Sequence, residues 1–392
     1  MTNFSKVVLK SGKEQSVKRF HPWIFSGAIK SIDELPDGEI VEVYSSDKEY
    51  LGTGIFNSGT IAIRLYSYQK TEFNQDFWIS KFQDAYNYRE KLGLINNEIT
   101  NAYRLIHAEG DNLGGLITDI YNDVAVIQAH TTGIHKFRQQ IAEAIAHVYK
   151  GKIKTVFDKS EKTLHKSESY ENMYLYGDKK NEVVVKENNN KFLINWEEGQ
   201  KTGFFLDQRD NRKLLGDYSN KKSVLNTFCY TGGFSVYSLN NGADHVDSVD
   251  ASKKAIDLTD KNIELNNVSE NHKSYAEDTF NFFKNHDMTY DIIILDPPAF
   301  AKHQSARHSA IMGYKRLNAE AMKRIKSGGI LFTFSCSQVV DRNLFHNTVM
   351  SSAIQAERNV KVMHHLSQPA DHPVSIFHPE GEYLKGLVLY IQ

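Results

Sequence analysis

DIIILDPPAF, at residues 291–300, is the stretch of this sequence that decides the fold. The four apolar residues 292–295 are too few for a helix, and an unbroken apolar run is typical of a strand buried on both faces of a parallel sheet. Pro297 and Pro298 cannot continue a hydrogen-bonded ladder, so the chain must leave the sheet directly after Asp296. The pattern predicts a carboxylate at the carboxyl edge of an open α/β sheet, where such sheets bind ligands.

The C-terminal half of the chain alternates short apolar runs with longer segments of helical periodicity. Strands are predicted at residues 224–225, 246–249, 292–295, 330–334 and 387–391, and helices at residues 234–240, 253–267, 314–326 and 344–357. Strands that alternate with helices pair in parallel, with helices on both faces of the sheet. We therefore expect an α/β domain over residues 198–392, built on a doubly wound, mostly parallel, Rossmann-like sheet.

The composition bounds the class of protein. The 392 residues are 40% hydrophobic and 24% charged, which is ordinary for globular proteins and predicts two or three domains. No apolar run approaches the ~18 residues that span a bilayer, and the N-terminus has no signal-peptide core, so we expect a cytoplasmic protein. The two cysteines and the sixteen scattered histidines indicate neither a disulfide framework nor a metal site.

The N-terminal region has the pattern of a small β-domain. Strand-like runs at residues 7–9, 40–43 and 61–65 are separated by turn signals, which predicts a barrel or sandwich over residues 1–70. Five lysine or arginine residues and one acid precede Trp23, while the formal net charge of the chain is only −1. Such a local basic patch beside aromatic side chains suits RNA, although a solvated basic edge with Trp23 in the core fits the same pattern.

The region between these two parts, residues 71–197, combines both kinds of pattern. Helices are predicted near residues 77–92 and 135–149, strands at 124–128 and 154–157, and a hairpin at 181–196. These elements predict a small α+β domain that the hairpin closes. His107 and Glu109 lie in a turn-rich part of it, where polar residues act in catalysis or simply hold a turn.

The junction between the first strand and first helix of the C-terminal sheet, residues 226–234, reads NTFCYTGGF. Two adjacent glycines allow a ligand to approach the backbone, but GxGxxG is absent, which disfavours a dinucleotide. Asp250 ends the next strand, where an acid can accept hydrogen bonds from a ribose diol. Asp278 is expected at the edge of the third strand, near an adenine amino group. Each acid also fits a loop cap or a helix N-cap.

Five segments, NTFCYTGGFS, SVDAS, AEDTF, LDPPAF and TFSCS, occur in an order and spacing that resemble class I S-adenosylmethionine-dependent methyltransferases. More closely, the chain is similar to the bacterial large-subunit ribosomal RNA cytosine-5 methyltransferases of the RlmI type. The likeness covers nearly the whole chain, because HPWIFSGAI resembles the N-terminal PUA domain of that family, RLIHAEGDNLGGLITDIY its central domain and GFFLDQRDNR the segment that enters its catalytic domain. It implies S-adenosylmethionine as cofactor and RNA-binding in 23S rRNA processing. Relatives of this type are often homodimers.

The resemblance also implies where the ligands bind. The cofactor site is expected at Phe204, Asp207, Arg209, Asn226, Phe228, Tyr230, Thr231, Gly232, Asp250, Ala251, Ser252, Asp278, Asp296 and Pro297. Substrate-binding residues are expected at Pro298, Phe300, Lys302, Ser335, Ser337 and Trp23. Arg209 fits the methionine carboxylate of the cofactor or, equally, a helix-capping salt bridge. Phe300 and Lys302 suit a flipped base and its phosphate.

Cys336 and Asp296 are the expected catalytic residues. Carbon 5 of cytosine is a poor nucleophile, and a thiolate that adds to carbon 6 turns the ring into an enamine able to attack a methyl group. Cys336 follows the predicted strand 330–334, at the same sheet edge as Asp296, and matches the nucleophile of the family; a buried, inert cysteine is the alternative. Asp296 resembles acids that hold the pyrimidine edge or stabilise its protonated form.

Two further residues bear on this chemistry. Cys229 lies in the cofactor loop, where packing is the favoured role. Pro298 stands where the better-known RNA cytosine-5 enzymes have a second cysteine that releases the product. The group that removes the carbon 5 proton is therefore left open.

We expect a three-domain transferase that methylates RNA, most specifically carbon 5 of a cytosine in 23S rRNA. Methylation of a guanine or adenine nitrogen is the enzymatic alternative, because DPP followed by an aromatic residue also resembles amino-methylating families. A non-catalytic RNA-binding assembly factor with the same fold is the other alternative, and the presence of both Asp296 and Cys336 counts against it.

Overall fold

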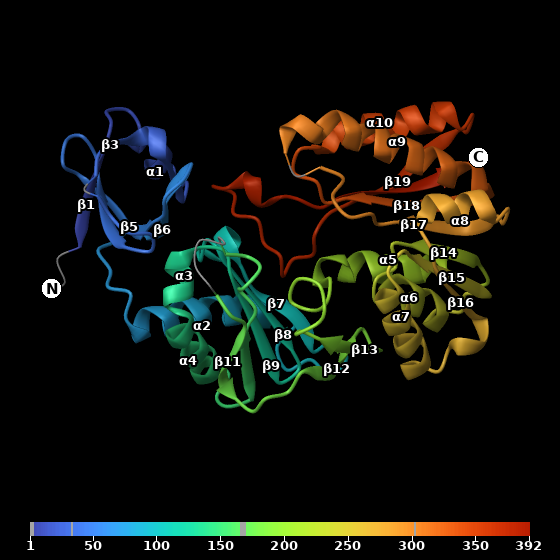
Figure 1. The fold of residues 1–392 in the computed structure, drawn as a ribbon, viewed down its shortest axis with the longest axis horizontal. Helices are drawn as coiled ribbons and strands as arrows, with labels where there is room; N and C mark the ends of the chain where they lie inside the picture. Colours follow the sequence, from blue (N-terminus) through green and yellow to red (C-terminus); the bar gives the residue numbers. More distant parts are fainter. Residues whose placement is uncertain (1–3, 33, 165–169, 302) are drawn as a thin grey trace. The chain divides into compact units, whose positions relative to one another are not determined.

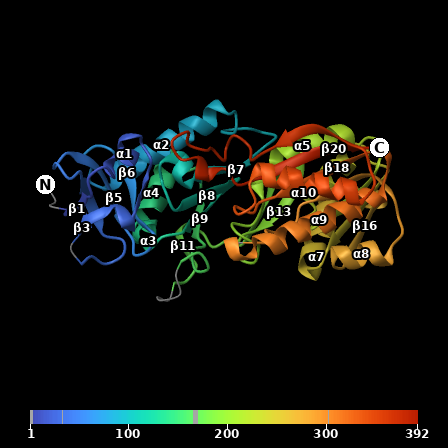
Figure 2. The same ribbon diagram turned by 90° about the horizontal axis from the view of Figure 1, so that it is seen from above.

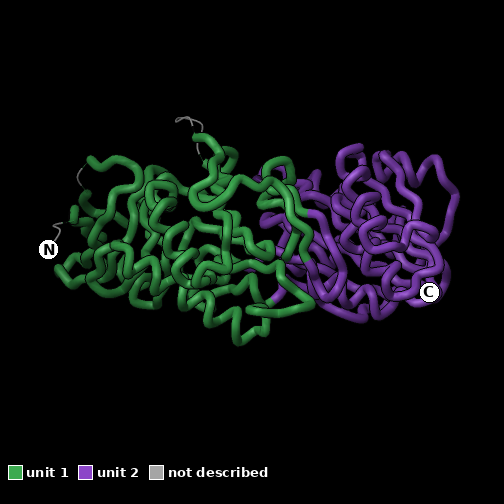
Figure 3. The backbone as a smooth tube through the Cα atoms, turned by 90° about the horizontal axis from the view of Figure 1, so that it is seen from below, with its two compact units in different colours: residues 1–185, 194–206, 370–381 green, residues 186–193, 207–369, 382–392 purple. Residues whose placement is uncertain are grey.

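The computed structural model describes residues 4–32, 34–164, 170–301 and 303–392 (Figure 1). Its backbone forms two compact units (Figure 3). Unit 1 contains residues 1–185, 194–206 and 370–381, and unit 2 contains residues 186–193, 207–369 and 382–392. Among the described residues, no helix combines the length and the apolar character that crossing a membrane requires.

The first sheet of unit 1 has the strand order β2-β6-β5-β4-β1-β3. Its elements are β1 (Ser5–Leu9), α1 (Glu14–Lys18), β2 (Trp23–Phe25), β3 (Ile29–Ser31), β4 (Ile40–Tyr44), β5 (Tyr50–Phe56) and β6 (Ile61–Ser67). Alternate residues of β1 face the core, since Val7 and Leu9 are fully buried, as a strand with one covered face requires. The three strands predicted here are confirmed as β1, β4 and β6.

The second sheet of unit 1 has the order β11-β10-β9-β8-β7. Its elements are α2 (Gln75–Lys91), β7 (Ala102–His107), β8 (Leu116–Tyr121), β9 (Val124–Ala129), α3 (Thr132–Lys136), α4 (Arg138–Val148), β10 (Thr155–Asp158) and β11 (Met173–Gly177). The single helix predicted at residues 135–149 is instead two helices that meet at Phe137. Thr131 starts the first of them by accepting a hydrogen bond from the Ile134 N–H.

The predicted hairpin is present as β12 (Glu182–Glu187) and β13 (Asn190–Asn195). Its tip, residues 186–193, belongs to unit 2, which differs from the expectation that the hairpin closes the central domain. The physical reason is Glu187, whose fully buried carboxylate forms an ion pair with Arg212 Nη2 at 2.8 Å. Tyr237 also donates to Glu187 Oε1 at 3.0 Å. A buried charge must stay with its partner, so the tip packs with unit 2.

The sheet of unit 2 has seven strands in the order β16-β15-β14-β17-β18-β20-β19. Their bounds are β14 (Ser223–Thr227), β15 (His245–Asp250), β16 (His272–Ala276), β17 (Tyr290–Leu295), β18 (Ile325–Ser335), β19 (Val360–Leu366) and β20 (Lys385–Ile391). The strands from β16 to β18 pair in parallel, and β20 is antiparallel to both β18 and β19. Residues 292–295 are buried as predicted, at the centre of this sheet.

Helices cover both faces of this sheet (Figures 1 and 2). They are α5 (Arg209–Tyr218), α6 (Gly233–Asn240), α7 (Lys253–Leu265), α8 (Thr279–Asn285), α9 (Arg307–Arg324) and α10 (Arg342–Gln355). Helices α5 to α7 lie on one face and α8 to α10 on the other. This is the doubly wound, mostly parallel fold that the alternating pattern predicts.

The Glu187–Arg212 pair should dominate the stability of unit 2. We expect Glu187→Ala to destabilise it by roughly 3–5 kcal/mol, because the buried cation of Arg212 loses the carboxylate that it pairs with. Thermal unfolding followed by circular dichroism would show a lower Tm. Asp257→Ala, which breaks the exposed pair with Lys253, should leave Tm unchanged. Equal Tm values for the two variants would contradict this role for Glu187.

Candidate active site

Parallel pairing aligns the carboxyl ends of the central strands of unit 2. Thr227 at the end of β14 pairs with Leu295 at the end of β17, and Leu295 pairs in turn with Thr333 of β18. On its other side, Thr227 lies opposite Val249 of β15. Residues that follow these positions leave the sheet at one edge, where open α/β sheets bind ligands. The candidates that reach this edge are the loop at 228–232, Asp250, Asp296 and Cys336.

The loop between β14 and α6 has an unusual backbone. Phe228, Tyr230 and Gly232 have φ angles of 55°, 48° and 71°, in the left-handed region that residues with a Cβ rarely adopt. Such strain persists only where surrounding contacts impose it, and it is common in ligand-binding loops. Gly232 is also the N-cap of α6, so the loop leads into the first turn of a helix, whose N–H groups favour negative charge.

Helix α7 holds the loop in this shape. Thr259 Oγ1 donates to the carbonyl of Tyr230 at 3.0 Å, and Asn262 Nδ2 donates to the carbonyl of Thr231 at 2.9 Å. Thr259 also packs against Gly232, where an added Cβ would lie 2.7 Å from Thr259 Cγ2. Position 232 therefore requires glycine for space as well as for its φ angle.

The two acids expected to bind the nucleoside are both engaged by backbone amides. Asp250 accepts hydrogen bonds from the N–H groups of Tyr230 at 3.0 Å and Ser252 at 2.9 Å. Asp278 is the N-cap of α8 and accepts from two N–H groups of its first turn, so the capping alternative is realised. A carboxylate has about four acceptor positions, and cofactor contacts by both acids stay a prediction.

Four other residues of the predicted cofactor set differ in exposure. Ala251 and Ser252 are exposed next to Asp250. Asn226 and Thr231 are buried, and Asn226 Nδ2 donates to Ser235 Oγ of α6 at 2.8 Å. The Asn226 side chain thus links the end of β14 to the helix that follows.

The three cofactor-binding residues predicted in the segment 203–209 do not all belong to one unit. Phe204 is buried in unit 1, whereas Asp207 and Arg209 are buried in unit 2. Asp207 Oδ2 accepts a hydrogen bond from Tyr383 Oη at 2.7 Å. Arg209 Nε lies 3.5 Å from Asp210 Oδ1, which matches the salt-bridge alternative. Cofactor binding by these residues stays a prediction.

After β17 the chain turns outward as the two prolines predict. Asp296 is partly exposed, Pro297 is buried and Pro298 is exposed. Phe300 packs on Tyr314 of α9, with ring centroids 4.6 Å apart. Burial raises the pKa of Tyr314 to about 12, and the charges of Cys336 and Asp296 add to that rise. Tyr314 is thus near both expected catalytic residues, and the sequence did not single it out.

Cys336 is held by two buried serines. Ser335 Oγ donates to Tyr314 Oη at 3.0 Å, and Ser337 Oγ donates to the carbonyl of Ala301 at 2.8 Å. Cys336 itself is partly exposed, whereas Cys229 is buried and its thiol pKa is raised by that burial. Of the two cysteines, only Cys336 therefore combines access with a fixed backbone.

Lys385 is a residue of this edge that sequence reasoning missed. It is the first residue of β20 and pairs with Ser335 in the antiparallel register. Its Nζ donates to the carbonyls of Ser337 and Tyr383, each at 2.7 Å. Burial lowers the pKa of Lys385 to about 8, against an opposing effect of Cys336. A charged residue at the start of an apolar strand was the signal that could have identified it.

One predicted substrate-binding residue, Trp23, lies in unit 1 and not at this edge. Trp23 is in β2 of unit 1, partly buried, and its Nε1 donates to Glu109 Oε1 at 2.7 Å. Its ring also packs edge-on against His378, with centroids 4.3 Å apart. Lys302 lies outside the described residues. Glu109, one of two residues considered for catalysis, therefore has a structural partner.

The chain matches two known protein families and is similar over its length to known methyltransferases. Residues 7–68 match a family of PUA-like domains, and residues 159–376 match a family of S-adenosylmethionine-dependent methyltransferases. The chain is 37% identical over 396 residues to ribosomal RNA large subunit methyltransferase I of Aeromonas hydrophila, covering 98% of this chain and 99% of that protein. The protein of the same name from Shewanella denitrificans is also 37% identical, over 394 residues, with 98% of each chain covered.

Two solved structures have the same fold as this chain over 98% of its length. A chain described as a candidate S-adenosylmethionine-dependent methyltransferase from Streptococcus mutans superposes with a TM-score of 0.85 at 25% identity, covering 98% of this chain and 99% of that chain. A methyltransferase of that kind in complex with S-adenosylhomocysteine gives a TM-score of 0.86 at 26% identity, with the same coverage.

The steric requirement at position 232 can be tested directly. Gly232→Ala should weaken binding of S-adenosylmethionine at least about tenfold, because the new Cβ meets Thr259 and the loop must shift. Isothermal titration calorimetry measures the affinity. Gly12→Ala is the matched control, since Gly12 also has a positive φ of 83° but open space around its Cβ position. A cofactor affinity unchanged by Gly232→Ala would show that this loop does not bind the cofactor.

Proposed function

Because the chain belongs to the family of the S-adenosylmethionine-dependent ribosomal RNA large subunit methyltransferases I, we propose that it methylates carbon 5 of a cytosine in 23S rRNA. The nucleophile in this proposal is Cys336, and Asp296 binds the base. S-adenosylmethionine supplies the electrophilic methyl group. The fold and its glycine loop are those of the cofactor-binding family.

The single observation that carries the proposal is the shared position of Cys336 and Asp296. They follow neighbouring parallel strands, β18 and β17, whose ends are in register through Leu295 and Thr333. Both are partly exposed between buried residues. An accessible thiol beside a carboxylate, next to the loop of the methyl donor, is what carbon 5 methylation requires. Methylation of an exocyclic nitrogen needs no such thiol.

These groups account for the addition and methyl-transfer steps, and the base that takes the carbon 5 proton is left open. The thiolate of Cys336 would form a bond to carbon 6, which makes carbon 5 nucleophilic. Carbon 5 would then take the methyl group as the methyl–sulfur bond of the donor breaks, and S-adenosylhomocysteine would leave. Asp296 accepts hydrogen bonds from the base, or protonates it, which offsets the negative charge that develops during the addition. Loss of the carbon 5 proton and of the thiolate then restores the ring double bond. Pro298 adds no second thiol for this release.

Lys385 supports the thiolate in this proposal. Its ammonium group is anchored on the carbonyl of Ser337, the residue after Cys336. A cation near a thiol favours the thiolate and so lowers the pKa of the cysteine. Lys385 carries this charge below its own pKa of about 8 and loses it above that pH. It acts through Cys336 and is a positioning residue.

The test of the nucleophile is methyl transfer to 23S rRNA from cells that lack this protein, with labelled S-adenosylmethionine and nucleoside analysis of the product. We expect label in 5-methylcytosine with the wild-type protein and at least about a 1,000-fold loss with Cys336→Ala. Cys229→Ala, which changes the buried cysteine of the loop, should fold and keep most activity.

The other outcomes separate the alternatives. Label in a purine, or undiminished transfer by Cys336→Ala, would overturn the covalent mechanism and favour a nitrogen methyltransferase. Absence of label on any RNA, with the cofactor still bound, would favour a non-catalytic assembly factor.

The role of Lys385 predicts a change in thiol chemistry. In a Cys229→Ala background, Lys385→Met should slow alkylation of Cys336 by iodoacetamide at pH 7 about tenfold and move the pH midpoint of the reaction upward by about one unit. Lys253→Met removes an exposed lysine of α7 and should change neither value. An unshifted midpoint in Lys385→Met would limit Lys385 to a structural role.

A further inference from the structure

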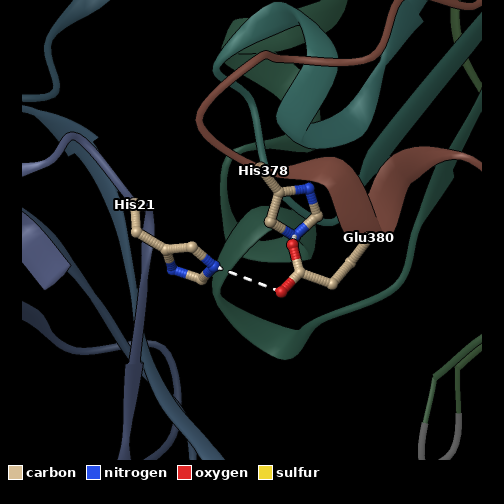
Figure 4. A group of neighbouring side chains, drawn as sticks. All are labelled: His21, His378 and Glu380. Carbon is tan, nitrogen blue, oxygen red and sulfur yellow. Dashed lines mark ion pairs between the residues drawn. The ribbon is translucent and has the colours of Figure 1, made fainter.

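We propose that His21, His378 and Glu380 of unit 1 form a binding site for a divalent transition-metal ion, with Zn²⁺ as the ion that fits best (Figure 4). His21 precedes β2, whereas His378 and Glu380 lie in the segment 370–381. Two imidazoles and one carboxylate are a ligand set that Zn²⁺ accepts, with a fourth position for water. The site goes beyond methyl transfer and is independent of it.

The three side chains already converge. His21 Nε2 lies 3.5 Å from Glu380 Oε1, and His378 Nε2 lies 3.8 Å from Glu380 Oε2. All three ligand atoms are within 4.8 Å of one another. Ligands at ~2.0–2.2 Å from a tetrahedral Zn²⁺ are about 3.4 Å apart, so small side-chain rotations complete the site.

His378 supplies a second observation. Its side chain is 2% exposed, and neither ring nitrogen has a hydrogen-bond partner among the described residues. A buried imidazole without partners is costly, and a metal ion would satisfy Nε2.

His21 is oriented for the same role. Its Nδ1 accepts a hydrogen bond from the N–H of Trp23 at 3.2 Å and lies 3.4 Å from the carbonyl of the same residue. Binding of a metal at Nε2 would move the proton to Nδ1, which would then donate to that carbonyl in place of accepting from the N–H. The Trp23 ring packs against His378, and its Nε1 donates a hydrogen bond to Glu109. The same ring also lies edge-on to His21, so Trp23 contacts both imidazoles.

The ion would fasten the segment 370–381 within unit 1. The beginning of this segment is already held, because Arg89 Nη2 donates to the Asp371 carbonyl at 2.8 Å and the Arg104 N–H donates to Asp371 Oδ2 at 3.0 Å. Its far end has only the long His21–Glu380 and His378–Glu380 contacts among the three proposed ligands. A metal ion there would fix the second end to β2. Sequence reasoning expected no metal site because these ligands come from opposite ends of the chain.

The test is metal binding by the full-length protein after treatment with a chelator. Titration calorimetry with ZnCl₂ should show one site that is absent or about 100-fold weaker in His378→Gln and in Glu380→Gln. Glu380 is half exposed, so Glu380→Gln keeps the fold even if His378→Gln does not. His346→Gln, at an exposed position of α10, is the matched control and should bind as the wild type does.

Co²⁺ gives a second readout that does not depend on methyl transfer. Addition of CoCl₂ should produce the intense visible absorption of a tetrahedral or five-coordinate site, and Glu380→Gln should lose it. The proposal is overturned if the wild-type protein binds no more Zn²⁺ than Glu380→Gln, or if the Co²⁺ spectrum is that of the hydrated ion. The cluster would then be an ordinary histidine–carboxylate contact, whereas the methyl-transfer assay would be unaffected.

Discussion

The in-register parallel pairing of β14, β15, β17 and β18 is the constraint on which the function of this protein depends. Parallel strands end at one edge, so the loop after Thr227, the acid after Leu295 and the thiol after β18 meet there although they are far apart in the chain. The antiparallel strand β20 begins at the same edge, because Lys385 pairs with Ser335. The meeting of the loop 228–232, Asp296 and Cys336 at one edge is thus a consequence of strand order and register.

Buried polar groups hold the loop 228–232 at this edge. Thr259 and Asn262 of α7 donate to its carbonyls, and its positive φ angles can persist only under such contacts. The side chain of Arg212 packs against Gly233, the first residue of α6, where an added Cβ would lie 3.0 Å from Arg212 Cδ. Arg212 also pairs with Glu187 at the tip of the hairpin. The stability of unit 2 and the shape of its loop therefore share the same contacts.

The segment 370–381 belongs to unit 1, although the residues before and after it in the chain belong to unit 2. The chain leaves unit 2 after Pro369 and re-enters it at Glu382. Between these points Arg89 and Arg104 of unit 1 donate hydrogen bonds to the segment. Two residues that follow its return make polar contacts within unit 2, since Tyr383 donates to Asp207 and Lys385 donates to the carbonyl of Ser337.

The sequence by itself determined the doubly wound fold, the turn at Asp296 and the position of Cys336 after its strand, because apolar runs and prolines act locally and parallel strands share an edge. It also determined the β-rich N-terminus and the hairpin. Only the tertiary structure decided that the hairpin tip belongs to unit 2 and that Lys385 and His378 have polar roles. These depend on burial and on contacts between residues far apart in the chain, which no local pattern encodes.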